Sequence, residues 1–125
     1  MKNVLIIGDS YSTFKGYIPK NYVHYYGVRG EDGRDFAEYM KVEETWWHRV
    51  ITITGSNLVL NNSWSGSPIG YTGYSGSDCS KNTSFIFRLR QLLENGFFEE
   101  NAIDTLFVFG GTNDSWADAP LGEIT

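Results

Sequence analysis

Three short motifs suited to acyl chemistry are spaced along this sequence. Gly8-Asp9-Ser10 offers a serine hydroxyl, Gly66 offers a backbone N–H that no side chain obstructs, and Asn113 offers a carboxamide. When a hydroxyl attacks an acyl carbonyl, negative charge develops on the carbonyl oxygen, and N–H donors placed around that oxygen stabilise it. A hydroxyl beside two backbone N–H groups and one carboxamide therefore predicts acyl transfer.

Each motif follows a segment with the composition of a buried β-strand. The segments are Asn3 to Ile7, Asn57 to Leu60 and Thr105 to Phe109, and each is short, apolar and followed by a turn signal. None alternates cleanly between polar and apolar residues, which favours strands covered on both faces, as in a parallel sheet. Because ligands of such sheets bind at the carboxyl ends of the strands, the three motifs are expected at one edge.

Two segments with helical spacing of apolar residues, Glu43 to Thr54 and Thr83 to Asn95, lie between the strands. Their alternation with strands implies right-handed crossovers and an α/β three-layer sandwich with a parallel sheet. The 125 residues fit one domain, 1–125. The long connections Tyr11 to Val42 and Asn61 to Ser80 are expected to be functional or mobile loops.

A sheet of three strands is expected to leave one edge open. From Ala117 to Thr125 the sequence shows no further strand or helix pattern. An open sheet edge favours pairing with another chain. We therefore expect that residues are missing at this edge or that the chain self-associates through it.

Charge and composition exclude several function classes. The net charge of −5 and the isoelectric point near 4.9 argue against binding to nucleic acid or to an anionic membrane. The longest aliphatic run, Val4 to Ile7, is too short for a membrane span or a signal peptide. Cys79 is the only cysteine, so no intrachain disulfide can form. These features predict a cytoplasmic protein.

The motifs resemble the first three sequence blocks of the SGNH (GDSL) hydrolase family. The matching residues are Gly8-Asp9-Ser10, Gly66 within Asn61-Asn62-Ser63-Trp64-Ser65-Gly66, and Gly111-Thr112-Asn113-Asp114. The resemblance implies a flavodoxin-like SGNH fold and hydrolysis of small acyl esters. It implies that Ser10 is the nucleophile and that the oxyanion hole consists of the N–H groups of Ser10 and Gly66 with the Asn113 side chain. No metal and no organic cofactor are implied.

The sequence departs from this family in one respect that matters for catalysis. The family's fourth block, an Asp-x-x-His pair that supplies the general base, has no counterpart here, and the only histidines are His24 and His48. We expect neither histidine to act as the base. Since a serine without a base is a poor nucleophile, the chain is expected to be the N-terminal part of such a hydrolase and to be inactive or weakly active.

Aromatic residues make up 16% of the chain, and those that flank the motifs are candidates for a substrate wall. The candidates are Tyr11, Trp64, Tyr71, Tyr74 and Trp116. Such a wall favours acetylated carbohydrate as the ester substrate. Asp114 is expected to support its loop instead of acting in catalysis.

Two alternative functions fit parts of the same pattern. The hydroxyl-rich turn from Gly8 to Thr13 could cradle a phosphate with its backbone N–H groups, in a flavodoxin-like protein that binds phosphate or flavin. That function would leave Gly66 and Asn113 without a role. The chain could also be a non-catalytic interaction fragment that binds a partner at the open sheet edge.

Overall fold

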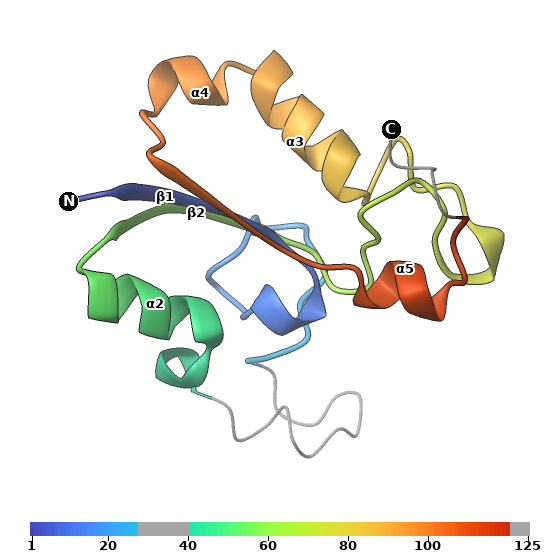
Figure 1. Cartoon of the computed structure of the whole chain (residues 1–125), viewed down its shortest axis with the longest axis horizontal. Helices are drawn as coiled ribbons and strands as arrows, with labels where there is room; N and C mark the ends of the chain where they lie inside the picture. Colours follow the sequence, from blue (N-terminus) through green and yellow to red (C-terminus); the bar gives the residue numbers. More distant parts are fainter. Residues whose placement is uncertain (28–40, 121–125) are drawn as a thin grey trace.

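The computed structural model describes residues 1–27 and 41–120, which form an α/β fold around a parallel sheet (Figure 1). Strand β1 (Asn3–Gly8) lies between β2 (Asn57–Ser63) and β3 (Thr105–Phe109). The apolar residues from Val4 to Ile7 are each at most 2% exposed, because layers on both faces cover the central strand. The predicted class, an α/β fold with a parallel sheet, is confirmed.

The register of the sheet brings the carboxyl ends of the strands level with one another. Gly8 at the end of β1 pairs with Ser63 at the end of β2 and with Phe109 at the end of β3. The chain therefore leaves all three strands at one edge of the sheet, and the three motifs emerge there together.

Helix α2 (Trp46–Thr54) covers one face of the sheet and follows the 3-10 helix η2 (Val42–Glu44) (Figure 1). The Thr45 hydroxyl caps its first turn. The helix ends at Gly55, whose φ of +64° is the left-handed conformation that favours glycine. The core on this face consists of Val4, Ile6 and Trp47, with Phe14, Val42, Trp46, Ile51, Leu58 and Phe107 packed against them.

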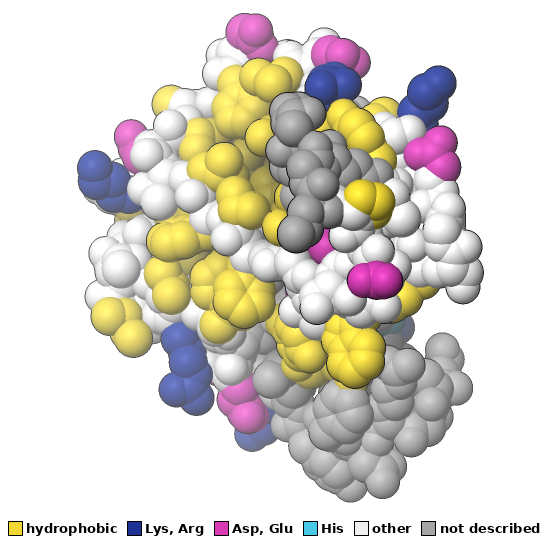
Figure 2. Space-filling view, turned by 45° about the vertical axis from the view of Figure 1, so that its right-hand side comes forward, with side chains coloured by type: hydrophobic (Ala, Val, Ile, Leu, Met, Phe, Trp, Pro, Cys, Tyr) yellow, Lys and Arg dark blue, Asp and Glu magenta, His cyan; other side chains and the backbone are white. Residues whose placement is uncertain are grey.

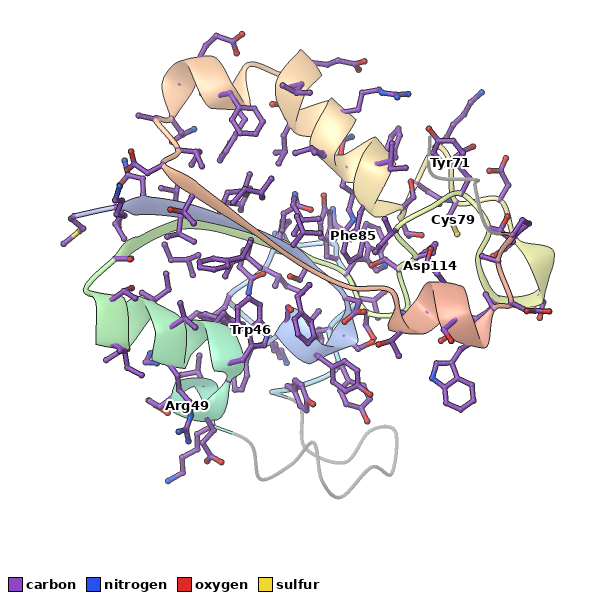
Figure 3. All side chains as sticks on the ribbon, in the orientation of Figure 1. Trp46, Arg49, Tyr71, Cys79, Phe85 and Asp114 are labelled. Carbon is purple, nitrogen blue, oxygen red and sulfur yellow. The ribbon has the colours of Figure 1, made fainter. Side chains whose placement is uncertain are left out.

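Helices α3 (Phe85–Glu94) and α4 (Phe97–Glu100) cover the opposite face. The Ser84 hydroxyl caps α3 by accepting a hydrogen bond from the N–H of Phe87 at 3.1 Å. The core on this face consists of Leu5, Ile7, Phe85 and Leu92, with Leu60, Ile69, Leu89, Phe97, Phe98 and Ile103 packed against them. Helices on both faces give the three layers that the sequence predicts, and Trp46 and Phe85 mark the two sides of the sheet in Figure 3.

Strand β2 is longer than predicted. It continues through Asn61, Asn62 and Ser63, which the sequence assigns to a loop. These polar side chains are each at most 2% exposed, and hydrogen bonds to other buried groups satisfy them. A polar strand end is therefore stable here although the sequence pattern alone indicates a turn.

Several short helices lie in segments that the sequence assigns to loops. They are η1 (Ser10–Ser12), η3 (Tyr74–Gly76) and α5 (Thr112–Trp116). After α5, the described residues up to Pro120 contain no helix or strand. Residues 28–40 of the first long connection and 121–125 of the tail lie outside the described residues. No helix within the described ranges is long and apolar enough to cross a membrane.

Strand β3 forms one edge of the described sheet and is only partly covered. Leu106 and Val108 pair with Leu5 and Ile7 of β1, yet they are 42% and 56% exposed. Phe109 at the end of the strand is 46% exposed. Figure 2 shows hydrophobic side chains grouped over a broad part of the visible surface. The described fold therefore presents an apolar edge to solvent.

Candidate active site

A cavity of about 180 Å³ lies at the edge of the sheet where the three strands end. Its walls come from η1 after β1, from the loop after β2 and from α5 after β3. The lining residues are Asp9, Ser10, Tyr11, Tyr25, Tyr74, Thr112, Asn113 and Trp116. Two of the three residues predicted for catalysis, Ser10 and Asn113, thus face one space.

The Ser10 hydroxyl lies between the first two motifs. Asp9 caps η1 by accepting a hydrogen bond from the N–H of Tyr11 at 3.2 Å. The Oγ of Ser10 is 2.9 Å from the Oγ of Ser65 and accepts a hydrogen bond from the N–H of Gly66 at 3.2 Å. Residues 56 positions apart in the sequence therefore meet at one hydroxyl.

Glycine at position 8 allows the backbone at the end of β1 to pack closely against η1 and β2. A Cβ on Gly8 would lie 2.5 Å from the Cβ of Ser12 and 2.9 Å from the Oγ of Ser63. The carbonyl oxygen of Gly8 also accepts a hydrogen bond from the N–H of Trp64 at 3.1 Å, which begins the second loop. Gly66 itself has a φ of +82°, a conformation that costs other residues about 1–2 kcal/mol.

The carboxamide of Asn113 is held at both of its polar atoms. Its Nδ2 donates a hydrogen bond to the carbonyl oxygen of Ser67 at 3.0 Å, and its Oδ1 accepts one from the hydroxyl of Tyr74 at 2.5 Å. The side chain is 7% exposed. A primary amide carries two N–H donors, and the described residues provide an acceptor for one of them, so the other can serve a ligand in the cavity.

Asp114 fastens α5 to the loop that follows β2. Its two carboxylate oxygens accept hydrogen bonds from the N–H of Ile69 at 2.8 Å and of Gly70 at 3.0 Å. Figure 3 shows Asp114 on α5, where it faces that loop. The carboxylate has the supporting role that the sequence predicts, and it keeps the neighbouring Asn113 at the cavity.

Three of the five aromatic residues predicted for the substrate wall line the cavity. Tyr11, Tyr74 and Trp116 line the cavity, and Tyr25, which the sequence analysis did not single out, lines it with them. Trp64 instead packs on the ring of Tyr22, with the ring centroids 4.4 Å apart. Tyr71 is not among the lining residues either, and its carbonyl oxygen accepts a hydrogen bond from the N–H of Cys79 at 2.7 Å.

Asp9 is a buried carboxylate beside the serine. Its exposed fraction is 0%, and its Oδ2 has no hydrogen-bond partner among the described residues. Burial is the largest influence and raises the pKa of Asp9 above its usual range, although the N–H of Tyr11 and the charge of Arg88 act in the opposite direction. The site thus contains an acid that resists ionisation.

Arg88 is a functional candidate that the sequence analysis missed. This residue of α3 is 0% exposed, and burial lowers its pKa to about 10, so the guanidinium stays charged at neutral pH. It donates hydrogen bonds to Gly8, Asn62 and Ser67 near the ends of β1 and β2, and to the carbonyl oxygen of Thr83 just before α3. A signal was present in the sequence, because Arg88 lies three residues after Phe85 and four before Leu92, on the buried face of the helix.

The described residues place no general base at the serine. The hydrogen-bond partners of the Ser10 hydroxyl are another hydroxyl and an amide N–H, and neither can take its proton at neutral pH. His48 lies on α2, where its Nδ1 is 3.4 Å from the Oγ1 of Thr52. His24 lies in the loop after η1 and is not among the residues that line the cavity. Within the described ranges, no three His, Cys, Asp or Glu side chains gather closely enough to hold a metal ion.

Comparison with known proteins identifies relatives over nearly the whole chain. Residues 2–125 match the family described as GDSL-like lipase/acylhydrolase. A protein from Bacteroides ovatus described as a GDSL-like lipase shares 41% identity and a TM-score of 0.80; the match covers 98% of this chain and 54% of that one. A second, from Bacteroides uniformis and similarly described, shares 45% identity and a TM-score of 0.78, with 98% and 53% covered. This chain thus spans about half the length of those structures. The comparison with curated proteins gave no match.

Proposed function

We propose that this chain, which belongs to the GDSL-like lipase/acylhydrolase family, carries the nucleophile and oxyanion hole of an esterase. The observation that carries the proposal is the meeting of Ser10 and Gly66 at 3.2 Å, beside a cavity that Asn113 also lines. The hydroxyl and the amide donors come from three strand ends that the register of the sheet holds level. Acyl transfer requires this combination of groups.

In the proposed reaction, the Oγ of Ser10 attacks the acyl carbon of an ester. The N–H groups of Ser10 and Gly66 and the Nδ2 of Asn113 stabilise the oxyanion, and loss of one such donor typically costs about 3–4 kcal/mol of transition-state stabilisation. The alcohol then leaves, and water releases the acid from the acylated serine. The hydroxyl proton has to pass to a base, and the described residues supply none within hydrogen-bond distance of Ser10.

We therefore expect the 125-residue chain alone to be inactive or weakly active. The Asp-x-x-His block that supplies the base in the SGNH family is absent from this sequence. Oxyanion stabilisation and binding alone can leave about 10³–10⁴-fold acceleration over water. The cytoplasmic location that the composition favours stays a prediction.

The volume and the lining of the cavity favour a small acyl ester, and acetylated carbohydrate is the substrate class that we propose. Its volume of about 180 Å³ is below the roughly 300 Å³ at which pockets for drug-sized ligands begin. Tyr11, Tyr74 and Trp116 offer aromatic surface and Thr112 offers a hydroxyl, a combination suited to a sugar ring. This volume also argues against the flavin-binding alternative.

The experiment that tests the proposal measures hydrolysis of p-nitrophenyl acetate by the chain and by its Ser10→Ala variant. Ser115→Ala is the control, because Ser115 is an exposed serine on α5. Circular dichroism confirms that all three proteins are folded. A weak rate that disappears in Ser10→Ala supports the proposed nucleophile, and a fast Ser10-dependent rate would mean that a base is present in this chain. Equal, near-background rates in wild type and Ser10→Ala would support a site that lacks its base, whereas a clear rate that Ser10→Ala leaves unchanged would contradict the proposal.

A further inference from the structure

We propose that Tyr74 is a positioning residue of the oxyanion hole, which fixes the Asn113 carboxamide with an N–H toward the reacting carbonyl oxygen. The inference rests on the proposed function and deepens it. The hydroxyl of Tyr74 donates a hydrogen bond to the Oδ1 of Asn113 at 2.5 Å. This contact joins η3, in the loop after β2, to α5 after β3, and both residues line the cavity.

The orientation of the carboxamide decides whether Asn113 can stabilise an oxyanion. A primary amide has an oxygen acceptor on one side and two N–H donors on the other. The hydrogen bond from Tyr74 requires an acceptor, and only Oδ1 provides one. The hydrogen bond to the carbonyl oxygen of Ser67, 3.0 Å away, requires a donor, and only Nδ2 provides one. Both partners therefore enforce the same orientation, and a reversed amide would point its oxygen at the developing negative charge.

The Tyr74 hydroxyl also strengthens the donor that it orients. A hydrogen bond to the oxygen of an amide polarises the group and makes its N–H a better donor. Partial burial of the phenol is the largest influence and raises the pKa of Tyr74 above its usual range. The phenol therefore stays protonated at neutral pH and keeps its proton available for Asn113.

The turn that carries Tyr74 is held by its own close contacts. The N–H of Gly73 donates a hydrogen bond to the carbonyl oxygen of Ser77 at 2.8 Å. A Cβ on Gly73 would lie 2.6 Å from the Sγ of Cys79, so the backbone is tightly packed there. The Tyr74 side chain is 44% exposed, and loss of its hydroxyl is expected to leave the fold intact. Tyr74→Phe is therefore a clean test of the hydroxyl alone.

The test measures how fast an alkyl fluorophosphonate labels Ser10 in the 125-residue chain, followed by intact-protein mass. During labelling the Ser10 oxygen bonds to phosphorus, fluoride leaves and the hydroxyl proton passes to solvent, while the phosphoryl oxygen takes the place of the oxyanion. Tyr74→Phe is expected to slow labelling about two- to tenfold, as the loss of one hydrogen bond does. Tyr17→Phe is the control, because Tyr17 is 49% exposed and lies outside the cavity lining.

A double-mutant cycle distinguishes positioning through Asn113 from direct contact with the probe. In an Asn113→Ala background, Tyr74→Phe is expected to change the labelling rate by less than about twofold, because the hydroxyl then has no carboxamide to act on. Equal slowing in both backgrounds would overturn the positioning role.

A second measurement separates this inference from the proposed function. If Ser10→Ala labels clearly and as fast as the wild type, the proposed nucleophile is wrong. In that case, and also if neither protein is labelled, nitrogen-15 NMR of the Asn113 side chain tests the role of Tyr74 independently. Tyr74→Phe is expected to shift those amide resonances, whereas Tyr17→Phe is not. Unchanged Asn113 resonances in Tyr74→Phe would overturn the inference.

Discussion

Arg88 donates a hydrogen bond to the carbonyl oxygen of Gly8, which lies 3.1 Å away and 80 residues earlier in the chain. The same guanidinium donates to the carbonyl oxygen and the Oδ1 of Asn62 and to the Oγ of Ser67. One buried side chain of α3 thus contacts the residue two before Ser10, the end of β2 and the residue after Gly66. Arg88 therefore supports both the turn that carries Ser10 and the loop that carries Gly66.

Replacement of Arg88 by methionine is expected to destabilise the fold severely. The substitution removes the Arg88 donors to the carbonyl oxygen and the Oδ1 of Asn62 and to the Oγ of Ser67, whereas the carbonyl oxygen of Gly8 keeps the N–H of Trp64. Each buried group left unsatisfied costs about 1–3 kcal/mol. The free energy of unfolding, measured by urea denaturation, should fall by at least about 3 kcal/mol. Arg90→Met on the exposed side of the same helix is the control, with a change within about 0.5 kcal/mol. Similar stability of the two variants would contradict the role of Arg88.

Strands β1 and β3 could be predicted from the sequence because local signals decide their bounds. The predicted Thr105 to Phe109 coincides with β3, and the predicted Asn3 to Ile7 lacks only the last residue of β1. In both strands an apolar run ends at a glycine, and no polar residue complicates the boundary. The end of β2 differs, because Asn61 to Ser63 form strand through hydrogen bonds to residues remote in the sequence.

The candidate site was predictable to the extent that turns follow strands. The Gly-containing turns after β1, β2 and β3 indicated where Ser10, Gly66 and Asn113 would meet, because parallel strands end at one edge. The partners of these groups could not be predicted in the same way. Contacts such as Ser65 with Ser10, or Tyr74 with Asn113, depend on how the loops fold over one another. The spacing of residue types along the sequence does not indicate such contacts.

Gly66→Ala is expected to lower the reactivity of Ser10 in addition to lowering the free energy of unfolding. The φ of +82° is unfavourable for alanine by about 1–2 kcal/mol, and relief of that strain would turn the N–H away from the serine. Gly55→Ala is a matched control, because Gly55 also has a positive φ and open space around its Cα but lies at the end of α2. Both variants should lose similar stability in urea denaturation. Only Gly66→Ala should slow labelling of Ser10 by a fluorophosphonate, and equal labelling by the two variants would argue against a role for the Gly66 N–H.

Asp9→Asn is expected to change how stability depends on pH. Because burial raises the pKa of Asp9 in the folded state, the stability contributed by its protonated form is fully present below the unfolded pKa of about 3.9. That contribution is lost as pH rises through the raised folded-state pKa. The free energy of unfolding of Asp9→Asn relative to wild type should therefore increase as pH rises above about 4 and then level off. Urea denaturation at a series of pH values measures it, and a constant difference between the two proteins would contradict the burial effect.

We propose, finally, that a second copy of the chain covers the exposed edge at β3. Leu106, Val108 and Phe109 are each more than 40% exposed there, and an unpaired parallel edge with apolar side chains favours strand pairing. Light scattering after size exclusion should show a mass that rises with concentration, and the double substitution Leu106→Lys and Val108→Lys should restore the monomer. Ile53→Lys is the control, because Ile53 is an 84% exposed apolar residue on α2, away from this edge. A wild-type chain that stays folded and monomeric at high concentration would overturn the proposal, because the β3 edge would then be stable in solvent without a second copy.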